Sequence, residues 1–118
     1  MANRRSAPRS AGRSSAGRDS FTEYVLDQLH LLDSVRARRI FGGHGLYRGR
    51  TFFGLTAGGC LYFKTDPETR SRYLERGMST FRPSPGQALS SYFEVPSEIL
   101  DDSRALADWA ADAIAVAE

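Results

Sequence analysis

The sequence predicts an α+β domain with two layers, in which helices cover a mainly antiparallel β-sheet. Three observations lead to this fold class. Apolar residues recur at helical spacing near both ends of residues 20–118, short aromatic runs separated by glycines lie between them, and a proline-containing helix start divides those runs. The predicted order of elements is α-β-β-β-α-β-β-α.

An N-terminal arm precedes this domain. Residues 1–19 consist largely of Arg, Ser, Ala, Gly and Pro without apolar periodicity, so we expect them to be disordered. Residues 1–18 carry five of the 16 basic residues and no acidic one, which leaves 11 basic against 14 acidic residues in 19–118. The alkaline pI of about 9.0 therefore reflects the arm, because the rest of the chain has a formal charge of −3.

Composition narrows the class of protein. A chain of 118 residues with 41% hydrophobic content fits a single folded domain, residues 20–118. The single cysteine, Cys60, excludes an internal disulfide and a cysteine cluster for zinc, and it fits a reducing compartment. No apolar stretch resembles a secretory signal or approaches the about 20 residues that span a bilayer. We therefore expect a cytoplasmic protein without a membrane segment.

The first predicted helix begins at Ser20 and runs for about 13 residues. Ser20 and Glu23 have the spacing of a capping box, in which each side chain bonds a backbone amide of the other. An apolar stripe then follows at helical spacing, formed by Phe21, Val25, Leu29 and Leu32.

A three-stranded meander follows, with strands at about 44–48, 51–56 and 60–65. The aromatic and aliphatic runs in these segments favour strands. The intervening breaks, 48–50 and 57–59, contain glycine, which supplies the positive φ that tight hairpin turns need.

A second helix is predicted to start at Pro67 and to end at Gly77. Thr65 or Asp66 can cap it, and proline is favoured at the first helical position. The helix is rich in arginine, so it should be short and mostly exposed, with Tyr73 and Leu74 as its contacts to the core.

Two further strands and a last helix complete the chain. The strands are predicted at 78–82 and 89–95, with a loop at 83–86 between them. Asp101 or Asp102 can cap the last helix, which explains this acidic pair more simply than catalysis does. Its packing face should consist of Leu106, Trp109, Ala110, Ala113 and Ile114.

Several motifs resemble one known family. The string Phe41-Gly42-Gly43-His44-Gly45-Leu46-Tyr47, then Phe53-Gly54-Leu55, then Leu61-Tyr62-Phe63-Lys64-Thr65-Asp66, and finally Ser91-Tyr92-Phe93-Glu94-Val95-Pro96, resemble the N-terminal domain of TfoX/Sxy-type competence regulators. The resemblance covers about residues 20–117. The motif residues to which it gives a structural or binding role are Phe41, Gly42, Gly43, Gly45, Leu46, Tyr47, Phe53, Gly54, Leu55, Leu61, Tyr62 and Lys64.

This resemblance implies an α+β domain of a bacterial regulatory protein. It supplies no catalytic residue to carry over, and it implies no cofactor. In the two-domain members of the family a helical domain follows, whereas this sequence stops at Glu118. A role in competence is therefore an expectation that rests on resemblance to only the N-terminal domain of the two-domain regulators.

The residues themselves offer weak candidates for chemistry. The Gly42–Gly45 cluster precedes a strand and lacks the lysine of a phosphate-binding loop, so a bend or bulge is the better interpretation. His44 and the other histidine, His30, do not have metal-ligand spacing, which favours a hydrogen-bonded or exposed turn histidine at 44. Cys60 is expected to be a packing residue. We predict no metal and no catalytic site, and an enzyme using His44 or Cys60 is the remote alternative.

A basic region of the sequence surrounds the aromatic residues Tyr47 and Phe52. It can contact phosphate or a protein partner, and aromatic residues on strands can also stack on bases. The leading hypothesis is a non-enzymatic module that binds a protein partner or a second copy of itself, and nucleic-acid binding together with the arm is the alternative. The basic residues of this surface are Arg36, Arg38, Arg39, Arg48 and Arg50.

Overall fold

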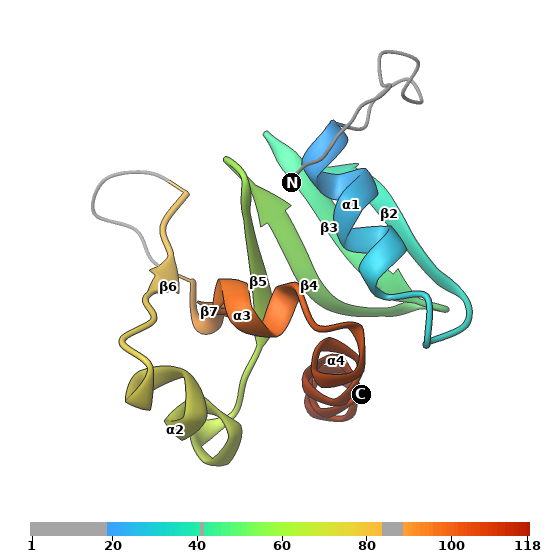
Figure 1. Ribbon diagram of the computed structural model, residues 1–118. Coiled ribbons are helices and arrows are strands. Elements are labelled where there is room, and N and C mark those ends of the chain that lie inside the picture. The colour runs from blue at the N-terminus through green and yellow to red at the C-terminus, as the bar shows by residue number, and fades with distance from the viewer. Residues whose placement is uncertain (1–18, 41, 84–88) are drawn as a thin grey trace.

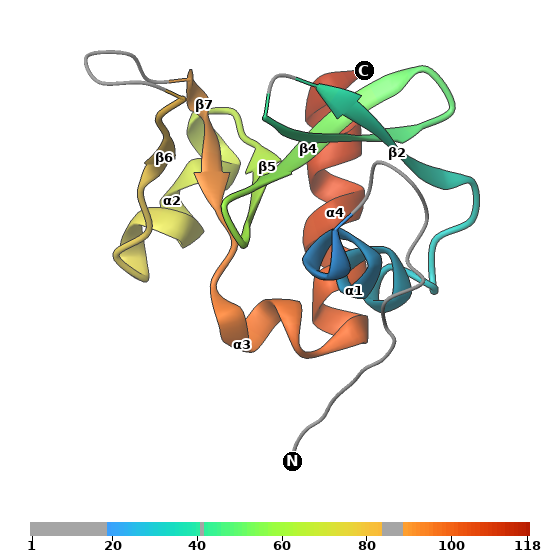
Figure 2. The same cartoon turned by 90° about the horizontal axis from the view of Figure 1, so that it is seen from above.

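The computed structural model describes residues 19–40, 42–83 and 89–118. They form a six-stranded antiparallel sheet with the strand order β2-β3-β4-β5-β7-β6, together with four helices (Figures 1 and 2). The predicted fold class, α+β with a mainly antiparallel sheet, is confirmed. The elements are α1 (Ser20–Gln28), β2 (Val35–Ile40), β3 (Gly43–Arg48), β4 (Thr51–Ala57), β5 (Cys60–Lys64), α2 (Pro67–Glu75), β6 (Thr80–Phe81), β7 (Leu89–Glu94), α3 (Ser97–Leu100) and α4 (Ser103–Ala117).

The predicted meander corresponds to β3, β4 and β5. Gly49 turns the chain between β3 and β4 with a φ of 61°, and Gly58 and Gly59 turn it between β4 and β5. The β3–β4 pairing shifts register between Leu46 and Tyr47, which marks a β-bulge. The meander therefore lies where the glycine-bearing turns predicted it.

The strand β2 was missing from the predicted order. It pairs with β3 along its whole length, from Val35 opposite Arg48 to Ile40 opposite Gly43. Its sequence, VRARRI, hides the alternation of a strand because arginines occupy three of the six positions. Val35 and Ala37 nevertheless pack against the main hydrophobic core, while Arg36 and Arg38 are exposed.

The first helix is capped one residue earlier than predicted and is shorter. The carboxylate of Asp19, not Ser20, accepts the amide of Thr22 at 2.8 Å. The helix ends at Gln28, so His30 lies in the turn that follows instead of on the helix. A short loop then leads to β2 through Ser34, which has a φ of 64°.

The second helix begins as predicted. Asp66 and Thr69 form a capping box, and Pro67 occupies the first helical position. Tyr73 is buried against the core as expected, but Leu74 is 57% exposed, so its predicted core contact is wrong.

The C-terminal third contains one unpredicted element, the short helix α3. Asp102 caps the long helix α4 by accepting the amides of Arg104 and Ala105 at 3.1 Å each. Asp101 instead accepts the hydroxyl of Tyr24 at 2.6 Å. The whole predicted face of α4 is buried, namely Leu106, Trp109, Ala110, Ala113 and Ile114.

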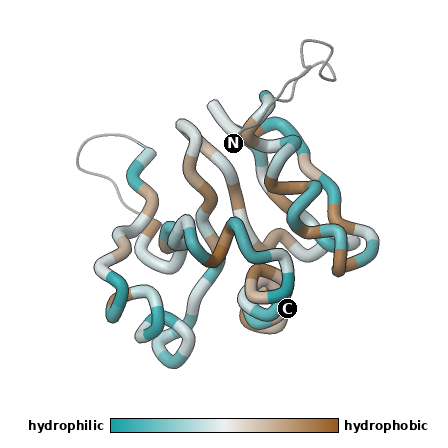
Figure 3. The backbone as a smooth tube through the Cα atoms, in the orientation of Figure 1, coloured by the Kyte–Doolittle hydropathy of each residue, from teal (hydrophilic) through white to brown (hydrophobic). Residues whose placement is uncertain are grey.

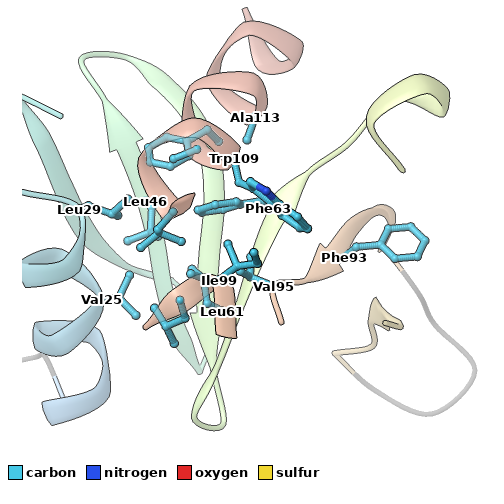
Figure 4. Packing of buried hydrophobic residues seen from close by; sticks show 14 of the residues in the cluster. Val25, Leu29, Leu46, Leu61, Phe63, Phe93, Val95, Ile99, Trp109 and Ala113 are labelled. Carbon is cyan, nitrogen blue, oxygen red and sulfur yellow. The ribbon is translucent and has the colours of Figure 1, made fainter. Parts of the chain in front are cut away.

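One large core lies between the sheet and the helices. All four helices contribute to it, through residues such as Val25, Tyr73, Ile99 and Trp109, so they cover the same face of the sheet. Figure 4 shows this packing, and Figure 3 shows hydrophobic positions on the strands and on α1 and α4. The rings of Tyr73 and Trp109 meet edge to face with centroids 4.8 Å apart.

Three predictions fall wholly or partly outside the described residues: the disordered arm, the motif residue Phe41, and most of the loop at 83–86. The division into an arm of residues 1–19 and a domain of residues 20–118 stays a prediction. None of the helices in the described ranges has the length and apolarity needed to cross a membrane.

Candidate functional site

The face of the sheet opposite the helices carries a second, smaller hydrophobic cluster. Its described members all lie on strands, and no described helix contributes to it. Leu55, Phe81 and Tyr92 are buried at its centre, whereas Phe52 and Tyr62 are only partly buried. We call this surface the open face. It consists of Arg36, Arg38, Ile40, Tyr47, Phe52, Leu55, Ala57, Cys60, Tyr62, Lys64, Phe81, Tyr92 and Glu94.

A row of three aromatic rings crosses the open face. Phe52 on β4 lies between Tyr47 on β3 and Tyr92 on β7, with ring centroids 5.1 and 5.6 Å apart. The Tyr47 and Phe52 rings are stacked at an interplanar angle of 27°. Phe52 therefore contacts both tyrosines, because its ring stacks on that of Tyr47 and is tilted at 33° against that of Tyr92.

Cations flank both ends of this row. The guanidinium carbons of Arg36 and Arg38 lie 5.2 and 5.8 Å from the Tyr47 ring centroid, and the Lys64 amine lies 5.2 Å from that of Tyr92. These distances are within the range of cation–π attraction. The open face thus combines a hydrophobic centre with positive charge on the β2 side and near β7.

Gly45 makes room for the aromatic row. A β-carbon at this position would lie 3.0 Å from ring atoms of both Phe52 and Tyr47 and 3.4 Å from the Ile40 side chain. Gly43 has a different role, because a β-carbon there would overlap the backbone carbonyl oxygen of Thr56 on the neighbouring strand. Two glycines of the cluster are thus explained by close packing, and no phosphate-cradling loop is needed.

A polar group lies beside the aromatic row. The thiol of Cys60, the hydroxyl of Tyr62 and the carboxylate of Glu94 interact with one another. Burial and the neighbouring Cys60 raise the pKa of Tyr62 to about 12, so its hydroxyl stays protonated at neutral pH. Burial, together with the charge of Glu94, also raises the pKa of Cys60, which opposes formation of the thiolate nucleophile.

The predicted basic residues lie on the β2–β3 hairpin and in the turn after it, but they do not share one face: Arg36 and Arg38 lie on the open face, and Arg39 and Arg48 on the other side of the sheet. Arg36, Arg38 and Arg39 lie on β2, Arg48 ends β3, and Arg50 is in the turn after it. Two of them have partners on the hairpin or just before it. Arg36 donates to the carbonyl oxygen of Gly49 at 3.0 Å, and Arg48 forms an exposed ion pair with Asp33 at 2.9 Å.

His44 lies away from the open face. It is 6% exposed, and its Nδ1 is 3.5 Å from the hydroxyl of Thr22, which in turn is 2.8 Å from the hydroxyl of Thr56. His44 is therefore a buried histidine beside two hydroxyls between α1 and the sheet. Among the described residues, no three His, Cys, Asp or Glu side chains are grouped as metal ligands would be.

The motif residues divide between the two faces of the sheet. Leu46, Phe53 and Leu61 belong to the main core, whereas Leu55 and Tyr62 belong to the open face. Gly54 lets the Phe63 ring approach, since a β-carbon there would lie 2.9 Å from that ring. Gly42 has a φ of 76° in the turn before β3.

Sequence reasoning singled out Tyr47 and Phe52 with the arginines but missed the other half of the open face. The sequence placed Tyr92 and Glu94 in a predicted strand and in the family motif, and Phe81 in a predicted strand, without linking any of them to this surface. Lys64 and Tyr92 are opposite one another on β5 and β7, a pairing that joins segments about 28 residues apart. A period-two pattern separates the two faces within one strand, but it does not show which strands are neighbours.

A comparison with protein families gives one match. The model of the TfoX N-terminal domain family matches residues 27–117, which includes every residue of the open face. No curated protein matches the chain.

Proposed function

The chain belongs to the TfoX N-terminal domain family, and from this premise we propose that it is a non-enzymatic binding module that docks an acidic protein partner on the open face. The observation that carries this proposal is the partly exposed aromatic row with a cation at each end, on a sheet face to which no described helix contributes. We further propose a regulatory role in the cytoplasm, in line with the resemblance to competence regulators.

The composition of the open face supports a protein partner. Tyrosine and arginine are enriched where proteins bind one another, because they combine a large apolar contact area with a polar end. Tyr62 keeps its proton at neutral pH, so it can donate a hydrogen bond across an interface. Three cations against one carboxylate, Glu94, give the face a positive charge that suits an acidic partner.

The ring geometry disfavours stacking of nucleic-acid bases. Base stacking needs an accessible aromatic face. Phe52 has a ring neighbour on each side in the row, while Tyr47 and Tyr92 are also covered by cations. A base would have to displace these contacts, whereas a protein surface can pack on the row as it stands.

The proposal is tested by capture with matched charge reversals. The full chain, a Lys64→Glu variant on the open face and an Arg104→Glu variant on α4 are immobilised, and each is exposed to lysate with and without nuclease treatment. Arg104 is exposed and lies outside the open face, so it is the control. Circular dichroism and thermal melting verify that both variants fold.

We expect one or more acidic proteins, identified by mass spectrometry, to be retained by the unmodified chain and by Arg104→Glu but lost by Lys64→Glu. Equal retention by all three chains would overturn the proposal. So would retention that disappears with nuclease treatment, since it would show a nucleic-acid ligand. A stable dimer of the purified chain that Lys64→Glu dissociates would show that a second copy occupies the face.

A further inference from the structure

The strand β2 forms one border of the sheet. In the described part of the chain it pairs only with β3, so its other side has no strand neighbour (Figure 1). An edge strand presents backbone N–H and C=O groups that an extended chain can pair with. β2 is six residues long, which is enough for a regular ladder.

The side chains of β2 differ between its two faces. Arg36 and Arg38 are exposed on the open face beside Tyr47. Val35 and Ala37 lie on the helix face and are partly buried against the main core. Arg39, which is exposed, follows them on the helix face. A strand added beside β2 would therefore meet positive charge along the open face, and on the helix face it would meet apolar surface at Val35 and Ala37 followed by the charge of Arg39.

We propose that β2 takes up an extended acidic segment of the protein partner as a seventh strand. This inference rests on the proposed function and names the kind of segment that binds. Acidic side chains at alternate positions lie beside Arg36 and Arg38, and the apolar side chains between them lie beside Val35 and Ala37. Backbone hydrogen bonds provide the pairing, and the arginine–carboxylate contacts provide the selectivity.

The charge of β2 argues against a second copy as the occupant. Pairing two β2 strands would bring Arg36, Arg38 and Arg39 of one chain close to the same residues of the other. Like charges across a strand pair are destabilising, and charged side chains on an edge are a common means of preventing self-association. The same arginines attract a strand of opposite charge.

The test uses defined peptides with the full chain. The probe is a capped heptapeptide, Val-Glu-Val-Glu-Val-Glu-Val, and two controls accompany it: the same peptide with every backbone amide N-methylated, so that neither edge can donate to a ladder, and a peptide with lysine in place of glutamate. Affinity is measured by fluorescence anisotropy. Backbone amide NMR shifts show which residues of the chain respond.

We expect the acidic peptide to bind and to shift the amides of residues 35–40. The N-methylated and lysine peptides should not bind, because the first cannot complete the ladder and the second is repelled. The double variant Arg36→Gln/Arg38→Gln should weaken binding about tenfold, since two charge pairs are lost. Arg104→Gln, the control on α4, should bind as the unmodified chain does.

Equal affinity for the N-methylated peptide, an unchanged affinity of the double variant, or shifts confined to other elements would overturn the edge-strand inference. Displacement of the peptide by oligothymidine would also overturn the inference if oligothymidine binding were weakened by the same Arg36→Gln/Arg38→Gln variant, because the ligand of β2 would then be a nucleic acid. If Lys64→Glu abolishes partner capture and the peptide does not bind, only the edge-strand inference fails. If the peptide binds and capture does not depend on Lys64, the open-face proposal fails instead.

Discussion

The hydroxyl oxygens of Thr22 and Thr56 lie 2.8 Å apart in a buried contact that joins α1 to β4. Both residues are 2% exposed or less. Each hydroxyl therefore depends on the other, and on His44 at 3.5 Å from Thr22, for hydrogen bonding in the interior. Losing one partner leaves the other hydroxyl without its hydrogen bond, which costs more than losing both.

We expect Thr22→Val and Thr56→Val each to lower the free energy of unfolding by about 1–3 kcal/mol. Valine has nearly the shape of threonine, so the loss reports on the hydroxyl. The double variant should lose clearly less than the two single losses combined, with a coupling energy of at least about 0.5 kcal/mol. Urea denaturation of all four chains measures this cycle, and additive losses would contradict the contact.

Gly43 is the glycine of the motif that tolerates a side chain least. A β-carbon there meets a backbone carbonyl of β4, which cannot move without disturbing the strand pairing. We expect Gly43→Ala to lower the free energy of unfolding by more than about 2 kcal/mol. Gly45→Ala should cost less, because its β-carbon meets ring atoms at 3.0 Å that can shift slightly. Urea titrations of both variants give the comparison, and the reverse order would refute this explanation of the motif.

Local signals in the sequence predicted much of the fold. Glycines at 49, 58 and 59 marked two hairpins, and the aspartates and proline around residues 66, 67 and 102 marked two helix starts. These features act within a few residues of the chain, so they can be recognised without tertiary structure. The apolar spacing of α4 likewise predicted its buried face.

The rest of the fold depends on contacts that local patterns do not contain. β2 is a strand because Val35 and Ala37 complete the main core, although three arginines dominate its sequence. The open face exists because β7 inserts between β5 and β6, which brings Tyr92 to Phe52. Strand order is a property of the whole sheet, so aromatic residues in separate runs could not be assigned to one surface from the sequence.

The cap of α4 gives a third prediction. Asp102 accepts two backbone amides that would otherwise lack a partner in the helix. We expect Asp102→Ala to cost about 1 kcal/mol of unfolding free energy and to lower Tm by about 4 °C. Asp102→Asn should stay within a few tenths of a kcal/mol, because asparagine caps equally well. Thermal melts followed by circular dichroism check both, and equal losses would show that the charge matters and not the cap.

The last prediction concerns the reactivity of Cys60. Burial and the negative charge of Glu94 raise the pKa of the thiol, so little thiolate is present near neutral pH. Iodoacetamide should therefore alkylate Cys60 more slowly than a cysteine in a short unstructured peptide. Because the thiolate is the reactive form, the alkylation rate should rise with pH. It should level off only at a pH above the ordinary pKa range of a thiol.

Replacing Glu94 by glutamine tests the cause. Removal of the negative charge lowers the pKa of Cys60, so Glu94→Gln should react faster at neutral pH, and its rate profile should shift to lower pH. Glu75→Gln on α2 is the control, because Glu75 is exposed and lies outside the open face. The rates are followed by mass spectrometry from pH 6 to 10. An unchanged profile for Glu94→Gln would mean that burial alone controls the thiol, and that Glu94 does not act on this part of the open face.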